Sequence, residues 1–169
     1  MGLTLGRHSY IATHILSHDP EVRIGNFSSL AANITFHGKD NHTTETVSTF
    51  PWFTLYPEMP DLTYSKGKIL IGNDVWVGDR VSFLSGITVG DGAAIGARAV
   101  VAKDCVPYGI YVGNPAKLVK LRFKPEIILA LLYIKWWNWS DAKIQKNIQW
   151  FFKPVEEFIK EFRHLRAVK

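Results

Sequence analysis

Residues 71–106 read IGNDVWVGDRVSFLSGITVGDGAAIGARAVVAKDCV, and this stretch decides the fold of the chain. Large apolar side chains recur in it at every sixth position: Ile71, Val77, Phe83, Val89, Ile95 and Val101. A helix repeats its apolar face every three or four residues and an amphipathic strand every two, so a period of six fits neither. Short strands joined by repeated turns do fit it. The sequence therefore predicts an all-β solenoid whose interior is filled by the large residues.

The same rhythm starts before this stretch. Ile24, Leu30 and Phe36 hold the large apolar position, whereas residues 7–20 alternate too briefly to classify, and we expect them to form an irregular first edge. The rhythm stops after Phe36, and residues 37–68 are rich in turn-forming and aromatic side chains. Loops of this length within compact domains are uncommon and are usually functional. We expect an excursion from the coil whose aromatic residues either line a binding pocket or pack the loop onto its scaffold.

Beyond the repeat, proline and glycine residues close the coil and the pattern becomes helical. Residues 125–134 begin with a proline, which suits the first helical position, and carry apolar side chains on one face. Ser140 is placed to cap a second helix and Pro154 to open a third. The chain therefore divides into a solenoid domain, residues 1–115, and an α-helical C-terminal extension, residues 116–169.

Composition limits the setting and the partners. The chain has 169 residues, a formal net charge of +5 and one cysteine, Cys105, so no disulfide can form within one chain. We see neither a signal peptide nor a membrane-spanning run, and we expect a cytoplasmic protein. The basic C-terminal third suits an anionic ligand, a nucleic acid or a membrane face. Glu156, Glu157 and Glu161 dilute the positive face, so we do not expect membrane contact, and we expect no nucleic-acid partner.

A solenoid fills its own interior with repeating side chains. Any binding site therefore lies on an outer face, at an interface or under the excursion. The open strand edges of such a coil need cover, and self-association is a common way to provide it. We expect a homo-oligomer.

Five motifs occur in order along the chain. They are Gly6–Tyr10 (GRHSY), Asn41-His42 followed by Ser48–Trp52 (STFPW), Ile71–Trp76 (IGNDVW), Gly113–Ala116 (GNPA) and Lys135–Trp139 (KWWNW). Together they resemble the xenobiotic acetyltransferase branch of the hexapeptide-repeat acyltransferases, which includes chloramphenicol and streptogramin O-acetyltransferases and enzymes assigned to sugars. The resemblance implies a left-handed parallel β-helix, a homotrimer and acetyl-CoA as the acetyl donor.

Acyl transfer from a thioester needs a base for the acceptor's proton. Histidine suits this task because its unperturbed pKa is near 6.5, so the neutral form predominates at physiological pH. His42 stands in the excursion, and the resemblance aligns it with the catalytic histidine of the family. A solvated loop histidine is the alternative interpretation. Glu45 or a backbone carbonyl would orient the ring, and the sequence does not choose between them.

The resemblance also implies positions for the two substrates. Residues expected along the acetyl-CoA track are Trp76, Asp79, Ser85, Ala97, Ala102, Lys103, Asn114, Lys117 and Lys120. Residues expected to bind the acceptor are Tyr10, Asn41, Trp52 and Phe53. Small side chains admit the pantetheine arm, and the lysines either meet the nucleotide phosphates or form a solvated basic face. Asp79 is acidic where a small polar residue is usual, which weakens its assignment.

Among acceptors, we favour a hydroxyl or amine of a sugar or nucleotide-linked sugar, in surface polysaccharide synthesis. Acetylation of an antibiotic, chloramphenicol or a streptogramin, is the alternative. A purely structural β-helix, which would bind no CoA, is a second alternative. A zinc carbonic anhydrase is a third: the fold also resembles the hexapeptide-repeat carbonic anhydrases, which hold zinc through histidines of which two are five residues apart, as His37 and His42 are. We expect no metal, since residues 43–163 contain no further histidine and the earlier histidines precede the coil.

Overall fold

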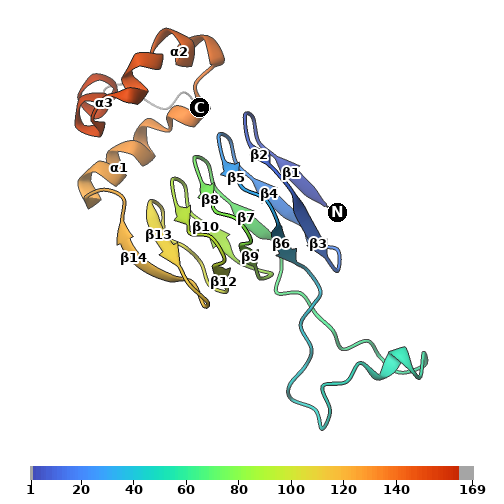
Figure 1. Ribbon diagram of the computed structural model, residues 1–169. Coiled ribbons are helices and arrows are strands. Elements are labelled where there is room, and N and C mark those ends of the chain that lie inside the picture. The colour runs from blue at the N-terminus through green and yellow to red at the C-terminus, as the bar shows by residue number, and fades with distance from the viewer. Residues whose placement is uncertain (1, 164–169) are drawn as a thin grey trace.

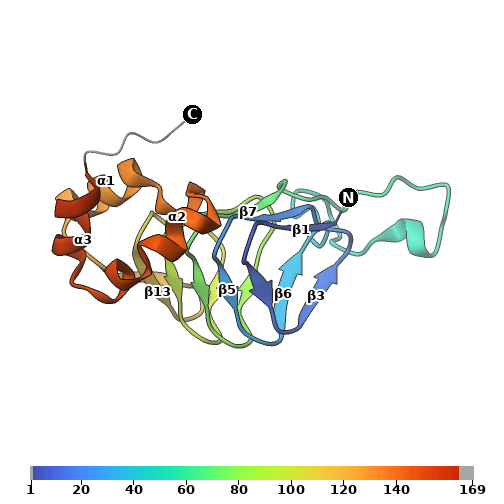
Figure 2. The same ribbon diagram turned by 90° about the horizontal axis from the view of Figure 1, so that it is seen from above.

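The computed structural model describes residues 2–163 and shows a coil of short strands that carries helices at one end and a long excursion at the other (Figure 1, Figure 2). Three sheets form the sides of the coil, and neighbouring strands in the coil are parallel. The predicted solenoid with C-terminal helices is confirmed.

Each turn of the coil contributes strands to the three sheets. The first sheet contains β1 (Leu3–Leu5), β4 (Val22–Ile24), β7 (Ile69–Ile71) and β10 (Thr88–Val89). The second contains β2 (Tyr10–Ile11), β5 (Ser29–Leu30), β8 (Trp76–Val77), β11 (Ala94–Ile95), β13 (Gly109–Val112) and β14 (Lys117–Leu121). The third contains β3 (His14–Ser17), β6 (Ile34–His37), β9 (Ser82–Phe83) and β12 (Val100–Val101).

The six-residue period places one large apolar residue inside at each side of the coil. Val77 pairs with Ile95 in the next turn, and Phe83 pairs with Val101. These four residues are fully buried, and each such burial contributes roughly 1.5–3 kcal/mol to stability. Cys105 also points into this core, and burial raises the pKa of its thiol to about 12.

A ladder of polar side chains runs along one corner of the coil. Asn73 donates from its backbone N and from Nδ2 to Asp91 Oδ1, at 2.7 and 2.8 Å. Asn26 N donates to Asn73 Oδ1 at 2.8 Å, and Arg7 N donates to Asn26 Oδ1 at 2.8 Å. A Cβ on Gly25 would lie 2.6 Å from Asn73 Oδ1, so only glycine permits this approach. The ladder ties successive turns together at the corner.

One expectation about the start of the coil is wrong. Residues 7–20 belong to a regular first turn, because Gly6 N donates to Ile24 O at 2.8 Å and Tyr10 N to Ser28 O at 3.0 Å. At the other end, strand β14 (Lys117–Leu121) pairs antiparallel with β13 and extends the second sheet, and the first C-terminal helix begins at Pro125. The division of the chain at residue 115 stays a prediction.

The three predicted C-terminal helices are confirmed. The helical elements are α1 (Pro125–Ile134), η2 (Trp136–Asn138), α2 (Asp141–Lys146), η3 (Ile148–Phe152) and α3 (Val155–Phe162). Ser140 caps α2 as expected, with Oγ accepting from Lys143 N at 3.3 Å. Residues 164–169 of the expected extension lie outside the described residues.

The tryptophan motif fastens these helices to the start of the coil. Arg7 donates from Nη2 to the carbonyl oxygens of Trp139 at 2.5 Å and Trp137 at 3.3 Å, and it also pairs with Asp141. The side chain of Trp137 is buried. The C-terminal helices therefore reach from β14 to the first turn of the coil, whereas the excursion projects from the opposite side (Figure 1).

Candidate active site

The excursion leaves the coil after β6 and returns before β7, and it projects away from the three sheets (Figure 1). Within residues 38–68 the only helical segment is the short 3-10 helix η1 (Trp52–Thr54). Asn41 and Tyr64 close the base of the excursion through two backbone hydrogen bonds of 3.1 and 2.8 Å. His42 is the first residue beyond this closure.

Ser85 lies directly under the base. Its Oγ accepts hydrogen bonds from Asn41 Nδ2 at 3.2 Å and from Lys66 N at 3.1 Å, and the residue is buried. The hydroxyl therefore binds both arms of the excursion and is not open to a cofactor. This placement is inconsistent with the expected position of Ser85 on the acetyl-CoA track.

Asp40 anchors the outgoing arm of the excursion. His37 Nδ1 lies 2.6 Å from Asp40 Oδ2, His18 contacts the other carboxylate oxygen, and Ser17 donates to it at 3.3 Å. Burial opposes the charge of Asp40, but hydrogen bonds from His37, Ser17 and His18 outweigh it and lower the pKa of the carboxyl below its ordinary value. His37 is thus engaged with Asp40 and serves the loop anchor.

The ring of His42 is held by the backbone. Its Nδ1 lies 2.7 Å from the carbonyl oxygen of Thr49, seven residues further along the excursion. A carbonyl oxygen only accepts, so Nδ1 carries the proton, and in the neutral ring the lone pair is on Nε2. Of the two expected orienting groups, the structure selects a backbone carbonyl over Glu45. Nε2 is the atom that can take a proton from an acceptor.

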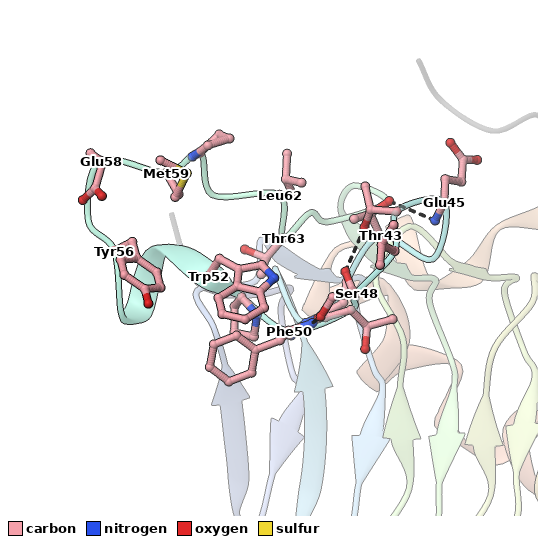
Figure 3. A pocket seen from close by; sticks show the side chains of 16 residues that line it. Thr43, Glu45, Ser48, Phe50, Trp52, Tyr56, Glu58, Met59, Leu62 and Thr63 are labelled. Atoms are coloured by element: carbon pink, nitrogen blue, oxygen red, sulfur yellow. Dashed lines mark hydrogen bonds between the residues drawn. The ribbon is translucent and has the colours of Figure 1, made fainter.

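A cavity of about 910 Å³ opens beside His42, and its lining residues all come from the excursion. Its apolar wall consists of Val47, Phe50, Pro51, Trp52, Tyr56, Met59, Pro60 and Leu62. The rings of Phe50 and Trp52 meet edge to face with centroids 5.0 Å apart (Figure 3). Trp52 is 47% exposed, so it does not pack the loop onto the coil. The aromatic residues of the excursion therefore line a pocket.

The other residues expected to bind the acceptor are more scattered. Asn41 lies at the base of the excursion, and Phe53 is beside Trp52 in η1 but does not line the cavity. Tyr10 lies on β2 in the second sheet, where its hydroxyl accepts from Ser29 Oγ at 2.5 Å. Within one chain, the structure does not bring Tyr10 to the cavity.

The remaining residues expected to bind acetyl-CoA lie on the outside of the coil. Asp79 and Ala97 lie at the same corner in neighbouring turns of the coil, because Arg98 N, next to Ala97, donates to Asp79 O at 2.8 Å. The other positions are exposed, on β8, after β12 and at or beyond β13: Trp76, Ala102, Lys103, Asn114, Lys117 and Lys120. None of them lines the cavity beside His42. One chain thus separates the candidate base from the candidate donor track.

Across residues 2–163, no group of three or more His, Cys, Asp or Glu side chains is arranged to hold a metal ion. Nor does any helix in the described part of the chain have the length and apolar character needed to cross a membrane.

Comparison with known proteins decides the family. Residues 68–103 match the model of the bacterial transferase hexapeptide (six repeats). A chloramphenicol acetyltransferase of Agrobacterium fabrum is 38% identical over 85% of this chain and 78% of its own length. A protein of Lysinibacillus sphaericus named "Probable macrolide acetyltransferase" is 40% identical over 75% of this chain and 74% of its own length. This chain is a hexapeptide-repeat acetyltransferase. It belongs to the xenobiotic branch, as the five motifs indicate.

A solved structure supports the same assignment. A galactoside acetyltransferase in complex with coenzyme A has a TM-score of 0.56 and 26% identity, and the match covers 73% of this acetyltransferase and 60% of that chain. Acetyl transfer is therefore the reaction class, which speaks against the purely structural alternative. The relatives named above are chloramphenicol and macrolide acetyltransferases, so they favour the antibiotic alternative over the sugar acceptor that we expected first.

Proposed function

We propose that this acetyltransferase moves the acetyl group of acetyl-CoA to a hydroxyl of an apolar, ring-bearing antibiotic of the chloramphenicol or macrolide type. The observation that carries the proposal is His42, whose Nδ1 proton is bound by the Thr49 carbonyl and whose Nε2 is free in the wall of an aromatic cavity. The names of the relatives support the acceptor class. The apolar wall around Phe50 and Trp52 supports an acceptor with apolar surface.

The chemistry follows from the tautomer of His42. Nε2 accepts the proton of the acceptor hydroxyl while the oxygen attacks the carbonyl carbon of the thioester. The tetrahedral intermediate then collapses, the carbon–sulfur bond breaks, and the imidazolium returns the proton to the departing thiolate. The products are the acetyl ester and free CoA. The Thr49 carbonyl keeps the ring oriented and stabilises the imidazolium that forms between the two steps.

The acetyl donor comes from the face of a neighbouring copy in a homotrimer. The cavity beside His42 is lined by the excursion alone, and the excursion projects away from its own coil (Figure 1). Ala97, Ala102 and Lys103 are exposed on the coil. A second copy that sets these residues against the excursion would complete the site, with Ala97 and Ala102 admitting the pantetheine arm and Lys103 meeting phosphate.

Removal of the base tests the mechanism. His42→Ala is expected to lower acetyl-CoA-dependent turnover by about 10²–10⁴-fold, since that is the usual contribution of a positioned base. Release of the CoA thiol is measured with chloramphenicol, a macrolide, a streptogramin and a galactoside as acceptors. His14→Ala, which removes an exposed histidine of β3, is the control and is expected to keep full turnover. Near-normal turnover in His42→Ala overturns the mechanism, and turnover with the galactoside alone overturns the acceptor class.

Subunit complementation tests the shared site. His42→Ala removes the base, and Ala97→Trp blocks the donor track on the exposed corner of the coil. Each variant alone is expected to be inactive. If the base and the track of one site come from different copies, mixed trimers of the two variants recover part of the wild-type turnover. Failure of properly mixed trimers to recover activity would show that each chain carries a complete site.

A further inference from the structure

We infer that Ser85 is a positioning residue that aims His42 by holding both arms of the excursion with a single hydroxyl. The inference rests on the proposed role of His42 as the base. Ser85 is 3% exposed, and its Oγ accepts from Asn41 Nδ2 at 3.2 Å and from Lys66 N at 3.1 Å. Asn41 belongs to the outgoing arm and directly precedes His42, whereas Lys66 belongs to the returning arm.

The other hydrogen bonds between the excursion and the coil also lie at its base, where Asp40 bonds Ser17 and His18 and where Gly67 O accepts from Gly86 N. Hydrogen bonds of residues 42–63 stay within the excursion: Thr49 binds His42, Asp61 binds Lys39 and Thr63, and η1 closes on itself. The direction in which His42 points is therefore set at the base.

Gly86, the residue after Ser85, also contacts the returning arm of the excursion. It adopts a φ of +80°, and a Cβ on it would lie 2.5 Å from the carbonyl oxygen of Lys66. Gly86 N also donates to Gly67 O at 3.0 Å. The backbone of the returning arm thus rests directly on Gly86, and the preceding Ser85 hydroxyl reaches across to the outgoing arm. This arrangement lets one coil position fix the separation of the two arms.

Loss of the Ser85 hydroxyl has a defined consequence. Asn41 Nδ2 keeps a second acceptor, the Tyr64 carbonyl at 3.1 Å, whereas Lys66 N loses its hydrogen bond to Ser85 Oγ. An amide that loses its acceptor makes the closed state less favourable. We expect the base to open more often and His42 to spend less time in its reactive orientation, while the coil itself is unchanged.

The experiment compares Ser85→Ala with Ser28→Ala. Ser28 is the matched control because it is also a buried serine of the coil. Its Oγ donates to Gly72 O at 2.9 Å and accepts from Val75 N at 3.1 Å, and neither partner belongs to the excursion. Full-length variants are first checked by circular dichroism for folding. Amide hydrogen exchange at Asn41 and Tyr64 then reports opening of the base, independently of any acceptor.

Ser85→Ala is expected to speed exchange at these two amides about tenfold or more and to lower kcat about tenfold or more, with the KM for acetyl-CoA unchanged. Ser28→Ala is expected to leave exchange and kcat unchanged. Wild-type exchange or wild-type kcat in Ser85→Ala overturns the inference, and so does an equal loss of kcat in Ser28→Ala. Because exchange needs no catalysis, these outcomes are distinct from retained turnover in His42→Ala, which would overturn the role of the base alone.

Discussion

The coil and the excursion are stabilised in different ways. In the coil each large residue stacks on its counterpart one turn away, as in the Phe36–Phe83 pair with ring centroids 5.5 Å apart, and every strand bonds to its neighbours. In the excursion, most side chains are exposed and the hydrogen bonds are local. This difference in stabilisation indicates that the coil and the excursion have different tasks. The coil supplies a frame, and the excursion carries His42, the proposed base, whose position depends on a few bonds at the base of the excursion.

The largest expected effect on stability lies in the coil. Phe83→Ala removes a fully buried ring that stacks between neighbouring turns, so the transfer cost and the cavity left behind are expected to lower the free energy of unfolding by about 3–5 kcal/mol. Unfolding in urea measures this free energy, and the protein concentration is kept fixed because association also contributes to apparent stability. A loss below about 1 kcal/mol would contradict a tightly packed interior.

The second effect is a pH dependence that originates at a corner of the coil. Burial raises the pKa of Asp74 to about 6, although Arg122 Nη1 lies 3.4 Å from its Oδ2 and partly offsets this, while Asp91 adds to it. The folded state thus holds this proton more tightly than the unfolded state, whose ordinary value is near 3.8. The contribution of Asp74 to the free energy of unfolding is fully present below about pH 4 and is lost as the pH rises through about 6. The expected loss is on the order of 3 kcal/mol.

Asp74→Asn isolates this contribution from the other titrating groups. The amide does not titrate, so the difference in unfolding free energy between the variant and the wild type is expected to change between pH 4 and pH 7 and to be flat outside that range. Unfolding in urea at several pH values provides the measurement. An unchanged difference across this range would mean that the carboxyl of Asp74 is not desolvated in the folded protein.

Much of the fold could be predicted because every turn of the coil repeats the same pattern of residues in the sequence. Ile71, Val77 and Phe83 are interior for the same geometric reason, so one turn predicts the next. The first turn escaped detection because its residues are more exposed and less apolar than those of later turns, and it is recognised only by its bonds to the second turn. Strand β14 escaped because it pairs antiparallel, outside the repeat.

The site was predictable only in part. His42 was singled out by its place in a motif, but nothing in the sequence indicates that a backbone carbonyl, that of Thr49, would orient its ring. Ser85 was assigned to the cofactor by analogy, whereas its burial under the base of the excursion depends on how two distant arms converge. Contacts of this kind have no period, and they follow only from the three-dimensional path of the chain.

The smallest expected effect on stability lies in the excursion. There, one variant distinguishes a side chain that packs the loop from one that binds the acceptor. Trp52 is 47% exposed and contacts mainly Phe50 and Tyr56, so Trp52→Ala is expected to change the free energy of unfolding by less than about 0.5 kcal/mol. Because Trp52 lines the cavity, the KM for the antibiotic acceptor is expected to rise several-fold while the KM for acetyl-CoA stays unchanged. Leu55→Ala is the matched control, since Leu55 is exposed in the same excursion and does not line the cavity. A loss of stability near that of Phe83→Ala would show that the excursion is packed like the coil, and the contrast between the two regions would fail.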